Sequence, residues 1–98
     1  MRDLIEKIEK WAEDRNIISG SNPIAQAQKT EEECQELLEA VAENDRLATI
    51  DAIGDIVVTL VIQCRMQRVD FIECVESAYD VIKDRKGKLI NGKFVKEI

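Results

Sequence analysis

Carboxylates with the spacing of a helix face occur in two parts of the sequence. Glu32, Glu33 and Glu36 lie in the segment TEEECQE, and Asp51 and Asp55 lie in DAIGD. Helix residues three or four positions apart share a face, with Cβ atoms about 5–6 Å apart. Two such helices packed antiparallel can direct both sets into one pocket, where all-oxygen ligands favour Mg²⁺ or Mn²⁺. This number of carboxylates is compatible with two ions, an arrangement that serves phosphoryl chemistry.

Asp55 is the most informative of these residues, because it opens the apolar run DIVVTLVI, where the helical pattern predicts a residue such as Leu. A buried carboxylate is costly unless it is paired with a cation or coordinates a metal. The alternative to a metal is a salt bridge from Asp55 to Lys29 or Arg46. The neighbouring glutamates can equally be solvated helix surface, since Glu is seldom fully buried.

Four helices and a short tail are predicted to position these groups. Apolar residues recur at helical spacing in four segments. The first runs from 2 to 16, and the second runs from a cap at Ser21 or Asn22, with Pro23 in its first turn, to about 43. The third runs from a cap at Asn44 or Asp45 to about 67, and the fourth from a cap at Asp70 to 87. Short connections favour an all-α, antiparallel four-helix bundle. An Asn-Gly pair at 91–92 predicts a hairpin in the tail.

The third helix is apolar nearly all round, which predicts that it is central or packs against another subunit. We therefore expect a homodimer or a homotetramer. Gly54 is a poor helix residue, and its expected use is the close approach of a neighbouring helix or a ligand beside Asp55. Trp11 and Tyr79 can stack on a base, although core packing is the more common role of such residues.

The composition predicts one acidic domain over residues 1–98, with residues 87–98 as its tail. The net charge is −6, and residues 30–64 hold nine acids and one base, whereas the tail is basic. This acidity argues against a partner that is a nucleic-acid polymer. No apolar run approaches the about 20 residues that span a bilayer, and the charged N-terminus lacks a signal pattern. We therefore expect no membrane partner and a cytoplasmic location.

The sequence has three cysteines and no histidine. Without histidine, a Ser–His or Cys–His nucleophile is excluded. An odd number of cysteines without a C-x-x-C pair argues against zinc sites and disulfides. Cys34, Cys64 and Cys74 are therefore expected to be small core residues in a reducing compartment.

The carboxylate pattern resembles that of a known family. The pattern Q-x-x-K-x-x-E-E-x-x-E over residues 26–36, followed by Gly-Asp at 54–55 and an apolar helix, is similar to the MazG-like all-α nucleoside triphosphate pyrophosphohydrolases. Their hallmark is E-E-x-x-E and, after a spacer, E-x-x-D. The ending DRKGKLINGKFV also resembles short MazG-like proteins of phages and bacteria. That hallmark would place Glu at position 52, where this chain has Ala52.

The resemblance implies a role for each matching residue. It implies metal ligands at Glu33, Glu36 and Asp55, with Asp51 as the substitute for the glutamate that Ala52 replaces. Glu32 or Glu36 is the implied catalytic base. The implied substrate-binding residues are Gln26 and Lys29 on the second helix, and Lys83, Arg85 and Lys86 near the end of the last.

The implied activity is Mg²⁺-dependent hydrolysis of a nucleoside triphosphate between the α- and β-phosphates, giving a monophosphate and pyrophosphate in nucleotide-pool control or house-cleaning. Two alternatives share the fold: a phosphoribosyl-ATP pyrophosphohydrolase and a hydrolase of dUTP or dCTP. A third alternative is a non-catalytic bundle that binds a nucleotide or a protein partner, which Ala52 favours. A purely structural adaptor does not explain Asp55.

Overall fold

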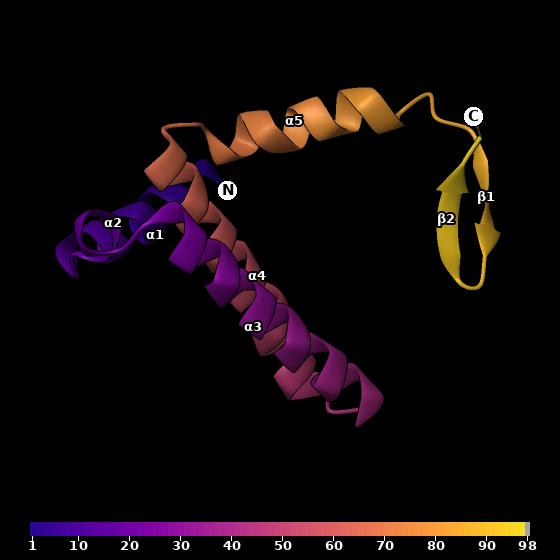
Figure 1. Ribbon diagram of the computed structural model, residues 1–98, viewed down its shortest axis with the longest axis horizontal. Helices are drawn as coiled ribbons and strands as arrows, with labels where there is room; N and C mark the ends of the chain where they lie inside the picture. The colour runs from indigo at the N-terminus through magenta and orange to yellow at the C-terminus, as the bar shows by residue number, and fades with distance from the viewer. Residues whose placement is uncertain (98) are drawn as a thin grey trace.

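The computed structural model describes residues 1–97 and consists of five helices followed by a β-hairpin (Figure 1). The elements are α1 (Arg2–Asp14), α2 (Ile17–Gly20), α3 (Pro23–Ala42), α4 (Arg46–Gln67), α5 (Phe71–Ile82), β1 (Gly87–Ile90) and β2 (Lys93–Lys96). The prediction of four helices missed α2. This single turn begins after Asn16, whose φ of 58° separates it from α1, which ends at Asp14. Four residues are too few to show a helical period.

Side-chain caps define the starts of α3, α4 and α5. Asn22, Asp45 and Asp70 each accept a hydrogen bond from the backbone N–H three residues later, at 2.9–3.0 Å. Such a bond satisfies one of the free N–H groups of a first helical turn, and its loss typically costs about 1 kcal/mol. These three predicted caps are confirmed, and Pro23 occupies the first turn of α3 as expected.

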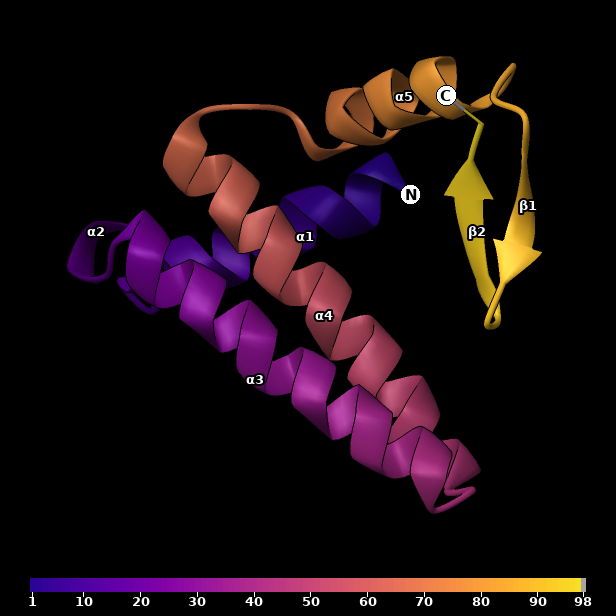
Figure 2. The same ribbon diagram turned by 45° about the vertical axis from the view of Figure 1, so that its right-hand side comes forward.

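The helix α4 lies at the centre of the packing. It runs antiparallel to α3 along most of its length and also contacts α1, α2 and α5 (Figure 2). The buried apolar side chains of the core come from α1, α3 and α4: Ile5, Ala12, Ala40, Ala52, Val61 and Ile62. The predicted central position of this helix is therefore confirmed.

One face of α4 nevertheless remains open in the single chain. The helix α4 has 22 residues and is apolar enough to cross a membrane, by length and composition alone. The prediction that no apolar segment is long enough to span a bilayer is therefore wrong. The central helix of a soluble protein meets the same criteria. Only 22% of the most apolar stretch of α4 is buried. The space beside Gly54 is also open, since an added Cβ would meet no atom within 4 Å among the described residues.

The last helix leaves the other four. The turn at residues 68–70, with Arg68 at φ 59°, ends α4, and α5 then makes few contacts with the rest of the chain. We call residues 2–67 the helical body and residues 71–96 the arm. Because α5 projects from the end of the body, the single chain does not close the predicted four-helix bundle (Figure 1). The helix also ends at Ile82, earlier than the expected stop at Gly87.

The arm ends in the predicted hairpin. Strands β1 and β2 pair antiparallel, with Gly87 opposite Lys96 and Ile90 opposite Lys93. Asn91 and Gly92 join them at φ values of 53° and 79°, the positive values that a two-residue turn of this kind requires. A side chain at Gly87 would collide with the carbonyl oxygen of Val95, so the pairing needs glycine there.

Candidate metal centre

Three carboxylates from the two central helices meet at one point. Glu33 and Glu36 project from α3 and Asp55 projects from α4, and one oxygen of each lies within 4.8 Å of the others. The antiparallel packing of α3 and α4 brings these residues together although they are far apart in the sequence. We call Glu33, Glu36 and Asp55 the carboxylate triad. That the triad binds a metal remains a prediction.

The buried member of the triad is Glu33, not Asp55. Glu33 is 8% exposed, whereas Asp55 and Glu36 are exposed. The prediction that Asp55 is the costly buried carboxylate is therefore wrong for the single chain. Asp55 opens the apolar run, but its position on α4 turns it toward the rim of the α3 contact. Among the described residues it makes no salt bridge with either Lys29 or Arg46.

One oxygen of Glu33 has the surroundings of a metal ligand. Its Oε1 atom lies 3.4 Å from Lys29 Nζ. Its Oε2 atom is buried and has no hydrogen-bond partner among residues 1–97. A buried carboxylate oxygen without a partner costs free energy, and a bound cation would remove that cost. The donor set of three carboxylates, with room for water on the exposed side, fits a hard ion such as Mg²⁺.

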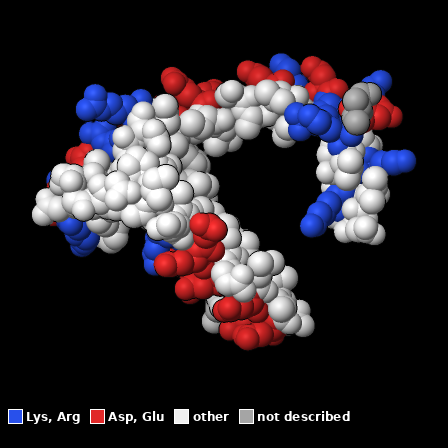
Figure 3. Space-filling view, viewed as in Figure 1, with Lys and Arg blue, Asp and Glu red and all other residues white. Residues whose placement is uncertain are grey.

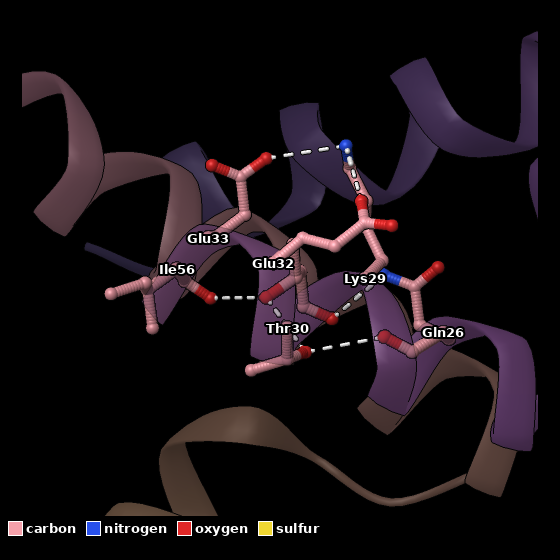
Figure 4. A network of polar contacts seen from close by, with 7 residues as sticks. Gln26, Lys29, Thr30, Glu32, Glu33 and Ile56 are labelled. Carbon is pink, nitrogen blue, oxygen red and sulfur yellow. Dashed lines mark hydrogen bonds and ion pairs between the residues drawn. The ribbon is translucent and has the colours of Figure 1, made fainter. Parts of the chain in front are cut away.

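Charges within the triad affect one another. The Glu33 carboxylate raises the pKa of Glu36, first by a side-chain hydrogen bond that favours the protonated form and then by repulsion of its charged form. Asp55 adds to this repulsion, and Lys29 opposes it. Lys29 bridges Glu32 and Glu33 at 3.3 and 3.4 Å, and these contacts raise the pKa of the lysine (Figure 4). The negative potential that results favours a divalent cation.

A polar network beneath the triad holds α3 against α4. Gln26 is 5% exposed, and its amide Nε2 donates to the carbonyl of Thr59 at 3.1 Å. Thr30 donates to the Thr59 hydroxyl at 2.9 Å, and that hydroxyl donates to the Ile56 carbonyl at 2.7 Å (Figure 4). The structure thus places Gln26 inside the α3–α4 contact, although the sequence assigned it to substrate.

Sequence reasoning missed both threonines. The available signal was a hydroxyl residue, Thr59, within the apolar run four positions after Asp55. A hydroxyl in such a run needs a hydrogen-bond partner, and the partner that the structure shows lies on α3. The two residues help to set the register in which Glu33 and Glu36 face Asp55.

Two hollows adjoin the triad, and Asp55 lines both. One, of about 380 Å³, is acidic. Its lining residues are Glu36, Glu39, Ala40, Glu43, Ala48, Asp51, Ala52 and Asp55. Asp51 therefore lies beside the triad but outside it. Ala52 is 4% exposed and packs in the core, so a longer side chain there would change the helix contact.

The second hollow is mainly apolar. It measures about 390 Å³, and Lys7, Ile8 and Trp11 of α1 line it together with Asp55 and Val58 of α4. Trp11 is 44% exposed, so the expectation of core packing for this residue is wrong in the single chain. The guanidinium of Arg15 lies 4.6 Å from the centre of the Trp11 ring and covers one of its faces.

The cations assigned to substrate lie on the arm. Lys83, Arg85 and Lys86 follow the end of α5, and Lys83 pairs with Asp80 at 3.5 Å. Acidic side chains gather over α3 and α4, while basic ones lie on the β-hairpin across an open space (Figure 3). A single chain therefore does not bring these three cations to the triad.

Comparison with known proteins identifies related chains. The family description "Phosphoribosyl-ATP pyrophosphohydrolase" matches residues 1–81. An uncharacterized 18.2 kDa protein from the rep-hol intergenic region of Haemophilus phage HP1 (strain HP1c1) is 40% identical over 72 residues. This match covers 74% of the present chain and 44% of the phage protein, so the chain spans less than half of that relative. No solved structure matches significantly.

Proposed function

Since the chain belongs to the phosphoribosyl-ATP pyrophosphohydrolase family, we propose that it hydrolyses a nucleoside triphosphate between the α- and β-phosphates. The products would be a monophosphate and pyrophosphate, which fits a role in controlling or cleaning the nucleotide pool. The observation that carries the proposal is the carboxylate triad, with its buried and unpartnered Glu33 oxygen.

Glu33, Glu36 and Asp55 would hold a Mg²⁺ ion, with Asp51 close enough to the same acidic hollow to bind a water or a second ion. A bound Mg²⁺ supplies charge neutralisation at phosphate oxygens and makes water easier to deprotonate. The triad supplies three negative charges for this purpose. Lys29 neutralises part of the excess charge through its 3.4 Å contact with Glu33.

Glu32 is our candidate for the general base. It lies on the exposed side of α3 beside the triad, and Lys29 holds its Oε2 atom at 3.3 Å. Because Glu32 is not one of the three proposed metal ligands, its carboxylate is free to accept a proton from water. Glu36 is the second candidate, because it lies in the triad itself and is exposed to solvent.

The apolar hollow beside Asp55 is our candidate for the nucleoside end of the substrate. Trp11 offers a partly exposed aromatic ring, and Ile8 and Val58 supply apolar walls. An aromatic ring of this kind can stack on a base. Asp55 lines both this hollow and the acidic one, so a nucleotide that occupied the first would direct its phosphates toward the triad.

We further propose that the protein works as a homodimer or a dimer of dimers. Exposed apolar side chains follow one side of α4 at Leu47, Ile50, Ile53 and Leu60, and the arm contains no buried residue. A second copy would cover this surface. The acidic body and the basic arm are complementary in charge, so the arm of one copy can bring Lys83, Arg85 and Lys86 to the triad of another.

A pyrophosphate-release assay over ribo- and deoxyribonucleoside triphosphates, with Mg²⁺ or Mn²⁺, tests the proposal. Phosphoribosyl-ATP belongs in the panel because the family name favours it as a second candidate substrate. Asp55→Asn and Glu36→Gln should each lower kcat/KM by on the order of 100-fold or more, since each removes a charged ligand. Glu31→Gln is the matched control, because it removes an exposed charge of the same helix outside the triad.

A thermal assay separates binding from turnover. At ten times its Kd, Mg²⁺ should add about 1.4 kcal/mol to the free energy of unfolding of the native chain, and Glu33→Gln should abolish this gain. Pyrophosphate release that is unchanged in Asp55→Asn and Glu36→Gln would exclude the triad as the active site. Stabilisation by Mg²⁺ and nucleotide without any pyrophosphate release would favour the non-catalytic binding protein.

A further inference from the structure

Two cysteines lie close together where the helical body meets the arm. The sulfur atoms of Cys64 on α4 and Cys74 on α5 are 4.0 Å apart, and both thiols are free. A disulfide requires about 2.05 Å between sulfur atoms, so bond formation needs an approach of about 2 Å. The sequence placed these cysteines in the core and argued against a disulfide. The structure instead leaves Cys74 exposed and Cys64 half-buried.

The arm can supply the required movement. The helix α5 has no buried residue and makes few contacts with α4. The turn at residues 68–70 joins the two helices, and the Arg2–Asp70 ion pair at 3.0 Å is an exposed link between α1 and the start of α5. Exposed ion pairs contribute little to stability. A small rotation of α5 about this turn would therefore meet little resistance.

The two thiols differ in reactivity. Burial, and after it the contact with Cys74, raises the pKa of Cys64 to about 11. Cys64 is therefore almost entirely protonated at neutral pH, and it is less exposed to solvent than Cys74. Because a thiolate is the reactive form and access to oxidant is needed, the exposed Cys74 would react first and Cys64 second.

We propose that Cys64 and Cys74 form a reversible intramolecular disulfide, a redox modification site that fastens the arm to the helical body. With hydrogen peroxide as oxidant, the Cys74 thiolate attacks one peroxide oxygen and hydroxide leaves, giving a sulfenic acid. The Cys64 sulfur then attacks the Cys74 sulfur. The Cys64 proton and the sulfenic hydroxyl leave as water, so two thiols and one peroxide give one disulfide and two waters.

The bond would fix the direction in which the arm leaves the body. Cys64 and Cys74 are ten positions apart and enclose the turn at residues 68–70. The cations after α5 and the hairpin would then keep one position relative to the triad of the same chain. The disulfide would therefore set where the arm can reach, and oxidation state would control this position.

Peptide mapping of the full chain tests the proposal. A Cys34→Ser variant leaves only the two thiols in question, and hydrogen peroxide should reduce its free-thiol count from two to zero. The intact mass should fall by two hydrogens, and trypsin should release peptide 47–65 linked to peptide 69–83. Dithiothreitol should restore both thiols.

Two single variants on this background assign the order of reaction. In Cys64→Ser, peroxide should leave a sulfenic acid on Cys74 that dimedone traps. In Cys74→Ser, Cys64 should stay unmodified under the same conditions. A dimer on non-reducing gels in place of the internal link, or oxidation of Cys64 alone, would overturn the proposal.

A melting experiment tests the fastening of the arm. The oxidised Cys34→Ser variant should melt several degrees higher than its reduced form, since the bond removes freedom from the unfolded chain. The oxidised Cys64→Ser variant is the control for peroxide damage, and its Tm should not rise. An internal disulfide without any rise in Tm would refute the claim that the bond fastens the arm.

Discussion

Local residues set the secondary structure in both the helical body and the arm, but only the body packs into a core. Every residue that the structure describes as buried belongs to the body, and α5 and the hairpin contain none. Both regions have capped helices or well-formed turns. Secondary structure therefore follows from local sequence in both, whereas a core forms only where helices find partners. The difference is the reason for proposing that the arm contacts a second copy.

The two regions also differ in charge. The triad and the acidic hollow lie on the body, while residues 83–96 of the arm hold six bases and one acid. A phosphate substrate needs a metal and cations at the same time. The single chain keeps the two apart, and the proposed second copy would unite them.

The largest expected difference between the body and the arm is in how much the replacement of one valine lowers the free energy of unfolding. Val61 is 1% exposed on α4, whereas Val75 is 52% exposed on α5. Val61→Ala should lower the free energy of unfolding by about 2 kcal/mol, because it deletes buried apolar volume. Val75→Ala should change the free energy of unfolding of the dilute single chain by less than about 0.5 kcal/mol. Urea denaturation at several protein concentrations measures both.

The same pair tests the proposed assembly. If a second copy covers α5, Val75→Ala should weaken self-association several-fold in sedimentation experiments. Equal losses of stability from the two variants in a dilute monomer would break the comparison between body and arm.

Removal of the arm cations should have a smaller effect. Arg85→Ala combined with Lys86→Ala should raise KM for the nucleotide several-fold, since each cation would contact phosphate. Stability should stay within about 0.5 kcal/mol, because neither residue is buried. Lys10→Ala is the matched control, since it removes an exposed cation of α1 whose one ion pair among residues 1–97 is with Asp14. An unchanged KM would exclude the arm from substrate binding.

Mixed oligomers decide which copy supplies the arm. Mixing Asp55→Asn subunits with subunits that lack both arm cations should create some sites with intact carboxylates and an intact arm. These sites should show the native KM if the arm acts on a neighbouring copy. If the arm acts only within its own chain, mixing should restore nothing.

The smallest expected effect concerns the link between the two regions. Arg2 lowers the pKa of Asp70 below its usual 3.8, chiefly through the side-chain hydrogen bond. A lowered carboxylate pKa gives stability that is present above the unfolded value and lost as pH falls through the folded one. The Arg2→Ala variant should therefore have a slightly lower Tm than the native chain at neutral pH and low salt.

This difference should disappear on acidification below pH 3.8, through the lowered pKa of Asp70, and in high salt, which screens exposed charges. Parallel melting curves against pH and NaCl measure it. A gap that persisted in acid would show that Arg2 acts through packing and not through its charge.

Local sequence determined much of this protein. Caps at Asn22, Asp45 and Asp70 and the Asn91-Gly92 turn were readable because each acts over only a few residues. The spacing of the carboxylates also followed from helix geometry. The phosphoribosyl-ATP pyrophosphohydrolase family match covers the body and almost all of α5, but not the hairpin.

Only the tertiary structure decided which carboxylate is buried, where Gln26 points and which cysteines meet. Glu33 is buried and Asp55 is exposed because of the way α3 is rotated about its axis relative to α4. The hydrogen bond between Thr30 and Thr59 forms in this orientation of the two helices. The approach of Cys64 to Cys74 depends on the angle at which α5 leaves α4. Such angles arise from packing between distant residues, and helical periodicity alone does not contain them.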